Sequence, residues 1–127
     1  MIVDALLAVL PADRVVIDPD VMASYQHDEA EWAPSATPLA VVRPATADEV
    51  QATVRACLAH GTAVVTRGAG TGLSGGANAT AGCIVLALDR MTAITEIDDL
   101  ERYAVVQPGV INDDLRAAVA EVGLWLS

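Results

Sequence analysis

The stretch Val64-Val65-Thr66-Arg67-Gly68-Ala69-Gly70-Thr71-Gly72-Leu73-Ser74-Gly75-Gly76 joins a short apolar run to a loop with five glycines in nine positions. The apolar run predicts a short buried strand. Because glycine has no Cβ atom, such a loop can adopt positive φ and direct several backbone N–H groups at one anion. The stretch therefore predicts a cradle for the phosphate or pyrophosphate of a nucleotide, with a flexible surface loop as the alternative.

The composition fits one small folded domain without a nucleic-acid partner. The chain has 127 residues, of which 54% are hydrophobic and 19% charged, and its formal net charge is -10. The apolar content argues against disorder, and the negative charge argues against a polyanionic partner. A phosphate can still bind an acidic protein where backbone N–H groups and one Arg surround it.

Nothing in the sequence indicates secretion or a membrane span. No apolar run approaches the roughly 18 residues that a membrane helix needs. Asp4 stands where a signal peptide would have a basic region. Cys57 and Cys83 lack the spacing of a metal or redox motif, which favours two buried thiols in a reducing compartment. We therefore expect a cytoplasmic location, no metal site and no transmembrane segment.

Residues 39–66, before the glycine loop, are predicted to form a strand, a helix and a second strand. Thr46 and Glu49 match a helix-capping box, and apolar residues recur at helical spacing up to Gly61, which suits the position just beyond a helix end. A crossover of this length is what parallel pairing requires. Ligands of α/β sheets collect at the carboxyl ends of strands, where the glycine loop begins.

The region after the glycine loop predicts three strands and a helix. Residues 83–88 are apolar throughout, and residues 94–97 and 103–106 have the spacing of an antiparallel hairpin closed by an acidic turn. Asn112 is predicted to cap a helix that ends at Gly123.

Two common phosphate loops do not explain the glycine run. A Walker loop ends in Gly-Lys-Ser/Thr, and the chain contains no Lys. Gly70, Gly72 and Gly75 match the GxGxxG pattern of nicotinamide-binding Rossmann folds, but that motif requires a helix directly after the loop. Here a short segment and then a strand follow. A loop between two strands, with Arg67 at its base, is the remaining type.

Three blocks in this order resemble the vanillyl-alcohol-oxidase/PCMH flavoprotein superfamily. They are Leu39-Ala-Val-Val-Arg-Pro-Ala-Thr-Ala-Asp-Glu-Val50, Val65-Thr-Arg-Gly-Ala-Gly-Thr-Gly-Leu-Ser-Gly-Gly76 and Val106-Gln-Pro-Gly-Val110. The likeness covers the whole chain and is greatest to D-lactate dehydrogenase and glycolate oxidase GlcD-type subunits. It implies an α+β fold: a PCMH-type FAD-binding domain with a small parallel βαβ subdomain followed by the start of an antiparallel sheet subdomain. We expect a helical amino-terminal arm over residues 1–38 and the FAD-binding domain, incomplete at its carboxyl end, over residues 39–127.

The resemblance also implies which residues bind FAD. In the family the Arg-Gly-x-Gly-Thr loop wraps the FAD pyrophosphate, and the Pro-Gly-Val segment lines the adenosine side. The positions that match in this chain are Arg67, Gly68, Ala69, Gly70, Thr71, Gly72, Leu73, Ser74 and Gly75 in the loop, Pro108, Gly109 and Val110 in the later segment, and Pro44 at the edge of the pocket. Relatives that attach FAD covalently have a His where this chain has Thr71, so we expect non-covalent FAD. The structural alternatives are a surface Arg at 67, a plain turn at Pro108–Gly109 and a strand terminator at Pro44.

The resemblance implies an oxidoreductase whose catalytic parts lie outside this sequence. The family parent oxidises a D-2-hydroxy acid of the lactate or glycolate type by hydride transfer to FAD. We therefore expect an FAD-binding fragment that has no catalytic residue and is inactive alone. Self-association is expected through an exposed edge of antiparallel strands over residues 84–106. The alternative is a non-catalytic nucleotide-binding or interaction module. His27, Asp28 and Glu29 are interpreted as an exposed polar loop.

Overall fold

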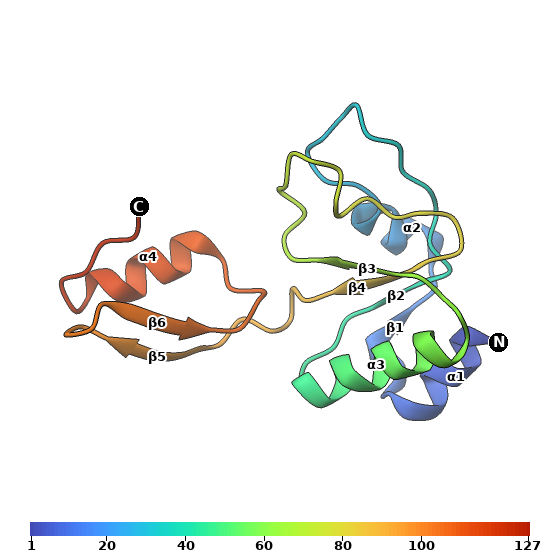
Figure 1. Ribbon diagram of the computed structural model, residues 1–127, viewed down its shortest axis with the longest axis horizontal. Helices are drawn as coiled ribbons and strands as arrows, with labels where there is room; N and C mark the ends of the chain where they lie inside the picture. Colours follow the sequence, from blue (N-terminus) through green and yellow to red (C-terminus); the bar gives the residue numbers. More distant parts are fainter.

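The computed structural model describes residues 1–127 as two lobes of unequal size (Figure 1). The larger lobe contains a four-stranded sheet, and the smaller lobe contains a two-stranded hairpin and one helix. The elements of the larger lobe are α1 (Ile2–Val9), η1 (Ala12–Arg14), β1 (Val15–Val16), α2 (Pro19–Met22), η2 (Ala23–Tyr25), β2 (Ala40–Val42), α3 (Ala47–Ala59), β3 (Val64–Arg67) and β4 (Ile84–Ala87). Those of the smaller lobe are β5 (Ile94–Asp98), β6 (Tyr103–Val106) and α4 (Asn112–Ala120).

The strand order of the larger sheet is β1-β2-β4-β3. β4 is parallel to both of its neighbours, and Val85 lies opposite Val41 on one side and Val65 on the other. The predicted parallel arrangement of β2 and β3 is confirmed, but the two strands are not neighbours, because β4 lies between them. The expectation that residue 84 begins an antiparallel set is wrong. All four residues of β4 are buried, as is typical of a central strand in a parallel sheet.

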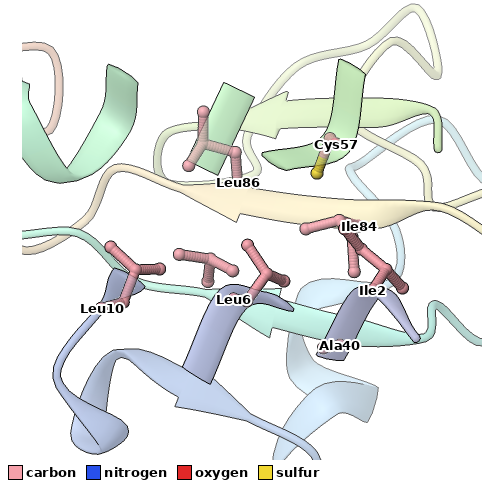
Figure 2. Close-up of a cluster of buried hydrophobic side chains, with 8 residues drawn as sticks. Ile2, Leu6, Leu10, Ala40, Cys57, Ile84 and Leu86 are labelled. Atoms are coloured by element: carbon pink, nitrogen blue, oxygen red, sulfur yellow. The ribbon is translucent and has the colours of Figure 1, made fainter. Parts of the chain in front are cut away.

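Alternate side chains of the central strands pack on opposite faces of the sheet, as the two-residue period of a strand requires. α1 and α3 cover one face, and α2 with the loops over residues 26–39 and 68–83 covers the other (Figure 1). Figure 2 shows the cluster on the helical face, which contains Ile2, Leu6, Leu10, Ala40, Val42, Cys57, Ile84 and Leu86. The cluster on the opposite face contains Met22, Val41, Ala79, Cys83, Val85 and Ala87.

The helix ends follow the predictions in part. The Thr46 side chain accepts a hydrogen bond from the Glu49 N–H, and the Glu49 carboxylate accepts one from the Ala45 N–H at 2.6 Å. Gly61 follows α3 with a φ of +62°, as predicted. The prediction that Asn112 caps α4 is wrong: Ile111, in an extended conformation, is the N-cap, and no side chain provides a cap hydrogen bond.

The smaller lobe confirms the predicted hairpin. β5 and β6 pair antiparallel, with an irregularity between Ile94 and Glu96. Asp98 accepts hydrogen bonds from the N–H groups of Leu100 and Glu101, which closes the acidic turn. A cavity of about 600 Å³, lined mostly by hydrophobic residue types, lies between the hairpin and the carboxyl end of α4. Each strand of the hairpin pairs only with the other, so both outer edges lack a partner. None of the helices is long and apolar enough to cross a membrane.

Candidate functional site

Arg67, the last residue of β3, lies beneath the glycine loop with only 6% of its surface exposed. One of its terminal nitrogens donates to the His27 carbonyl at 3.3 Å, and its guanidinium carbon lies 5.7 Å from the centroid of the Tyr25 ring. Its Nε has no hydrogen-bond partner, and Arg67 takes part in none of the ion pairs of the chain. It is therefore a buried cation without an acidic partner, not a surface residue.

Gly70 lies directly over this guanidinium. A Cβ atom on Gly70 would collide with the Arg67 side chain, and the residue has a φ of +75°, which glycine adopts without a steric penalty. An unpaired buried charge is unfavourable unless an opposite charge comes close to it. The loop therefore rests on a positive charge that an anion on the loop would compensate.

The backbone of the glycine loop has free hydrogen-bond donors. None of the N–H groups of residues 68–76 donates a hydrogen bond to another protein atom. The next backbone N–H along the chain that donates a hydrogen bond is that of Asn78, to the Gly75 carbonyl at 3.1 Å. Consecutive free N–H groups over a positive charge form an anion-binding site.

Asn78 ties the end of the glycine loop to the loop over residues 26–39. Its side chain accepts from the Asp28 N–H at 2.7 Å and donates to the carbonyls of Ala33 and Pro34 at 3.2 and 3.1 Å. Both Asn78 and Asp28 are buried, with 6% and 9% of their surfaces exposed. The interpretation of Asp28 as part of an exposed loop is therefore wrong. Sequence reasoning missed Asn78, although a polar residue that ends a glycine-rich run was a signal.

Two glycines allow the same pair of loops to meet closely. The Gly72 carbonyl accepts from the Glu29 N–H at 2.9 Å. A Cβ on Gly75 would lie 2.6 Å from the Ala33 Cβ, and Gly75 has a φ of +77°. The loop is thus held through its carbonyls and its flanks, and its N–H groups remain free.

The Pro108–Gly109 turn packs at the base of the glycine loop. The Gly109 N–H donates to the Met91 carbonyl at 2.8 Å, and a Cβ on Gly109 would collide with the Leu88 carbonyl just after β4. The Pro108 carbonyl oxygen lies 3.8 Å from the position of a Cβ on Gly68. The structure therefore brings together two of the three sequence blocks.

The other predicted positions differ in exposure. Among the predicted loop positions, the exposed ones are Ala69, Thr71, Gly72, Leu73 and Ser74. Val110 is half-buried, and its N–H donates to the Gln107 carbonyl at 3.2 Å. Pro44 follows β2 and is fully buried. Its side chain presents no surface to a ligand, which favours the structural alternative for Pro44, the end of a strand.

A polar cluster lies beside Arg67, where the parallel strands end. Asp89 accepts hydrogen bonds from Arg43 at 3.2 and 3.0 Å and from the Tyr25 hydroxyl at 2.9 Å. Burial and the hydrogen bond to Asp89 raise the pKa of Tyr25. Burial alone would raise the pKa of Asp89, but the hydrogen bonds from Arg43 and Tyr25 outweigh it and lower that pKa. Sequence reasoning assigned none of these three residues to the site.

The comparisons with known proteins agree with this geometry. The model of the family described as "FAD binding domain" matches residues 38–127. The chain belongs to this FAD-binding family. A solved structure of p-cresol methylhydroxylase superimposes with a TM-score of 0.79 at 29% identity, covering 97% of this chain and 24% of that one. The predicted PCMH-type FAD-binding fold is thus confirmed.

Curated relatives of this FAD-binding chain are longer oxidoreductases. A D-2-hydroxyglutarate dehydrogenase of Stutzerimonas stutzeri is 36% identical over 98% of this chain and 26% of its own length. Glycolate oxidase subunit GlcD of Bacillus subtilis is 38% identical over 90% of this chain and 22% of its own length. An uncharacterised FAD-linked oxidoreductase of Mycobacterium tuberculosis is 42% identical over 79% of this chain and 22% of its own length. The chain spans about a quarter of the length of the curated relatives it matches.

The residues present fit FAD, the cofactor of the family. Its pyrophosphate is an anion of the kind that free N–H groups at residues 68–76 and the unpaired Arg67 can hold. At Gly70 and Gly109 a side chain would collide with the Arg67 side chain and the Leu88 carbonyl, respectively, so the backbone approaches these groups closely. No group of three or more His, Cys, Asp or Glu side chains is placed to hold a metal ion.

Proposed function

We propose that this chain forms the amino-terminal FAD-binding part of an oxidoreductase that acts on a D-2-hydroxy acid. The observation that carries the proposal is the run of free N–H groups over residues 68–76, above the buried and unpaired guanidinium of Arg67. Relatives named for 2-hydroxy acids support the substrate class: the D-2-hydroxyglutarate dehydrogenase, the glycolate oxidase subunit and a D-lactate dehydrogenase of Anaerostipes hadrus.

The residues of this chain hold the end of the cofactor that does not react. FAD, when bound, supplies the flavin ring that accepts a hydride from the substrate. The N–H groups from Gly68 to Gly75 would donate to the pyrophosphate, and Arg67 would compensate its charge from below. Pro108, Gly109 and Val110 would line the adenosine side. We assign no catalytic residue to the chain and expect the chain alone to bind FAD weakly and to be inactive.

FAD is expected to be bound without a covalent link. Thr71 occupies the loop position at which covalently flavinylated relatives have a His. Acid precipitation should therefore release the flavin, and flavin retained on the precipitate would contradict this.

A reducing compartment is expected from the two cysteines. Cys57 and Cys83 are both free and buried, and they belong to the clusters on opposite faces of the sheet. Their state supports a cytoplasmic location.

Cofactor binding is tested by titrating the chain with FAD, ADP and riboflavin. Binding of FAD is measured by its fluorescence, and binding of ADP by its displacement of FAD. Riboflavin is the control that lacks the pyrophosphate. Saturable binding of FAD and ADP, with much weaker binding of riboflavin, is the expected result. Failure of both pyrophosphate compounds to bind, or equal affinity for riboflavin, would contradict the proposal.

The substrate class is tested on a protein that carries this sequence with the further segments found in its relatives. Under anaerobic conditions D-2-hydroxyglutarate, glycolate and D-lactate are added in turn, with the L-enantiomers of the chiral acids as controls. Bleaching of the flavin absorbance by a D-2-hydroxy acid is expected. FAD binding without reduction by any of these acids would favour the alternative, a non-catalytic nucleotide-binding module.

A further inference from the structure

Tyr25 contacts both Arg67, the cation beneath the glycine loop, and Asp89, a carboxylate that follows β4. Its ring centroid lies 5.7 Å from the guanidinium carbon of Arg67, and its hydroxyl donates to Oδ2 of Asp89 at 2.9 Å. The guanidinium carbon of Arg43 lies 5.8 Å from the same ring, and Arg43 donates two hydrogen bonds to Asp89.

The register of the sheet places Asp89 just beyond the end of the β3–β4 ladder, at the same edge of the sheet as Arg67. Arg67 lies opposite Ala87 in the β3–β4 ladder, and the N–H of Leu88, the residue before Asp89, donates to the Arg67 carbonyl at 2.9 Å. A carboxylate in this position would gain by pairing with a buried guanidinium. Asp89 is instead bound by Arg43 and Tyr25, and Arg67 has no ion pair.

We propose that Tyr25 is a positioning residue that keeps the Asp89 carboxylate away from Arg67, so that the charge of Arg67 remains available to the pyrophosphate on the glycine loop. This inference rests on the proposed function. The face of the ring stabilises the guanidinium by a cation–π contact, which does not neutralise it. The hydroxyl holds Asp89, whose charge Arg43 compensates. Because Tyr25 belongs to η2, the amino-terminal arm takes part in cofactor binding.

A double substitution tests this role. Affinities for FAD and ADP are measured for the wild type, Tyr25→Leu and the double variant Tyr25→Leu/Asp89→Asn, together with the melting temperature of each. In Tyr25→Leu, Asp89 keeps its hydrogen bonds from Arg43 but loses the one from the Tyr25 hydroxyl, so its carboxylate can turn toward Arg67. Both affinities should then fall roughly tenfold, the size of one lost charge-assisted contact. The double variant should regain most of the affinity without regaining the melting temperature. A merely structural role of Tyr25 predicts the opposite, because the double variant has lost more contacts.

The outcomes separate this inference from the proposed function. Failure of the wild type to bind FAD and ADP would contradict the proposed function. Wild-type binding that Tyr25→Leu leaves unchanged, or a loss that Asp89→Asn does not restore, would overturn the role of Tyr25 alone. Where Tyr25→Leu does not fold, Tyr25→Phe and Tyr25→Phe/Asp89→Asn provide the same comparison. Tyr25→Phe removes only the hydroxyl that holds Asp89, so a smaller loss is expected, again restored in the double variant.

Discussion

The guanidinium of Arg67 occupies the space into which a side chain on Gly70 would extend. Gly70→Ala should therefore displace Arg67 as well as strain the backbone at a φ of +75°. We expect it to lower the free energy of unfolding by about 1–3 kcal/mol and to weaken FAD binding. Urea denaturation and FAD titration measure the two effects. Gly76→Ala is the matched control in the same loop, because a Cβ there would meet no atom within 4 Å. Equal losses in both variants would contradict the role of the close approach.

The second close approach joins the two lobes at Gly109. A Cβ on this residue would collide with the Leu88 carbonyl, and backbone atoms cannot move aside as a flexible side chain can. Gly109→Ala is expected to destabilise the protein by about 1–3 kcal/mol, measured by urea denaturation. Gly68→Ala, on the neighbouring contact, would place its Cβ at an ordinary 3.8 Å from the Pro108 carbonyl oxygen. It should leave stability nearly unchanged, and a larger loss than in Gly109→Ala would refute this reading of the junction.

Asn78 provides the polar link between the two loops of the site. Asn78→Ala removes three hydrogen bonds and leaves the buried Asp28 N–H without an acceptor. We expect a loss of about 2–3 kcal/mol in the free energy of unfolding and faster hydrogen exchange at Asp28. Gln26→Ala is the control, because its side chain makes one exposed hydrogen bond of 3.4 Å to Thr37. Unaltered exchange at Asp28 in Asn78→Ala would show that the link is weaker than its geometry indicates.

The lowered pKa of Asp89 makes stability depend on acid pH. A carboxylate whose pKa is lower in the folded state than in the unfolded state stabilises the fold above the unfolded value, which is about 3.9 for Asp. That contribution is lost as the pH falls through the folded-state pKa. Glu49, whose pKa is lowered chiefly by its hydrogen bond from Arg14, acts in the same direction. Urea denaturation between about pH 6 and pH 3 should therefore show a smaller loss of stability in Asp89→Asn than in the wild type. Parallel curves for the two proteins would contradict this assignment.

The hairpin of the smaller lobe is expected to cause self-association. Both outer edges of β5 and β6 lack partners, and Tyr103 and Val105 are 43% and 47% exposed. Unpaired edges with exposed apolar side chains favour pairing between molecules, and a Lys on the edge opposes it. The elution volume in size-exclusion chromatography should decrease with protein concentration in the wild type and much less in Val105→Lys. Ala117→Lys, on the exposed surface of α4, should behave like the wild type. A single monomer peak for the wild type at all concentrations would exclude association through this edge.

The local parts of the fold could be predicted because single residues determine them. The Thr46 cap, the end of α3 at Gly61 and the hairpin turn at Asp98 depend on side chains and backbone within a few positions of each other. The position of β4 could not be predicted in the same way. Its apolar run indicates a strand buried on both faces, but the choice of partners depends on contacts between distant residues. The prediction for Asn112 is wrong by one position, because Asn112 is the first residue of α4 and Ile111 is the N-cap.

The same division applies to the site. The glycine loop, Arg67 and the Pro108–Gly109 turn could be found from residue types and their order. The burial of Arg67 and its lack of an ion pair could not, because they depend on how segments far apart in the sequence pack around it, such as His27 and the Tyr25 ring. Tyr25 and Asn78 are single polar residues in unremarkable sequence surroundings. Only the packing of the loops makes them part of the site.

The central position of β4 affects the order in which the protein can assemble. β2 and β3 share no ladder, so the parallel sheet is incomplete until residues 84–87 have joined it. The segment that must close to bring β4 between them is the glycine loop. Because closing a loop carries an entropic penalty, a ligand that binds residues 68–76 in their closed arrangement also favours completion of the sheet. We therefore expect cofactor binding and completion of the parallel sheet, with the hydrophobic clusters on its two faces, to stabilise each other.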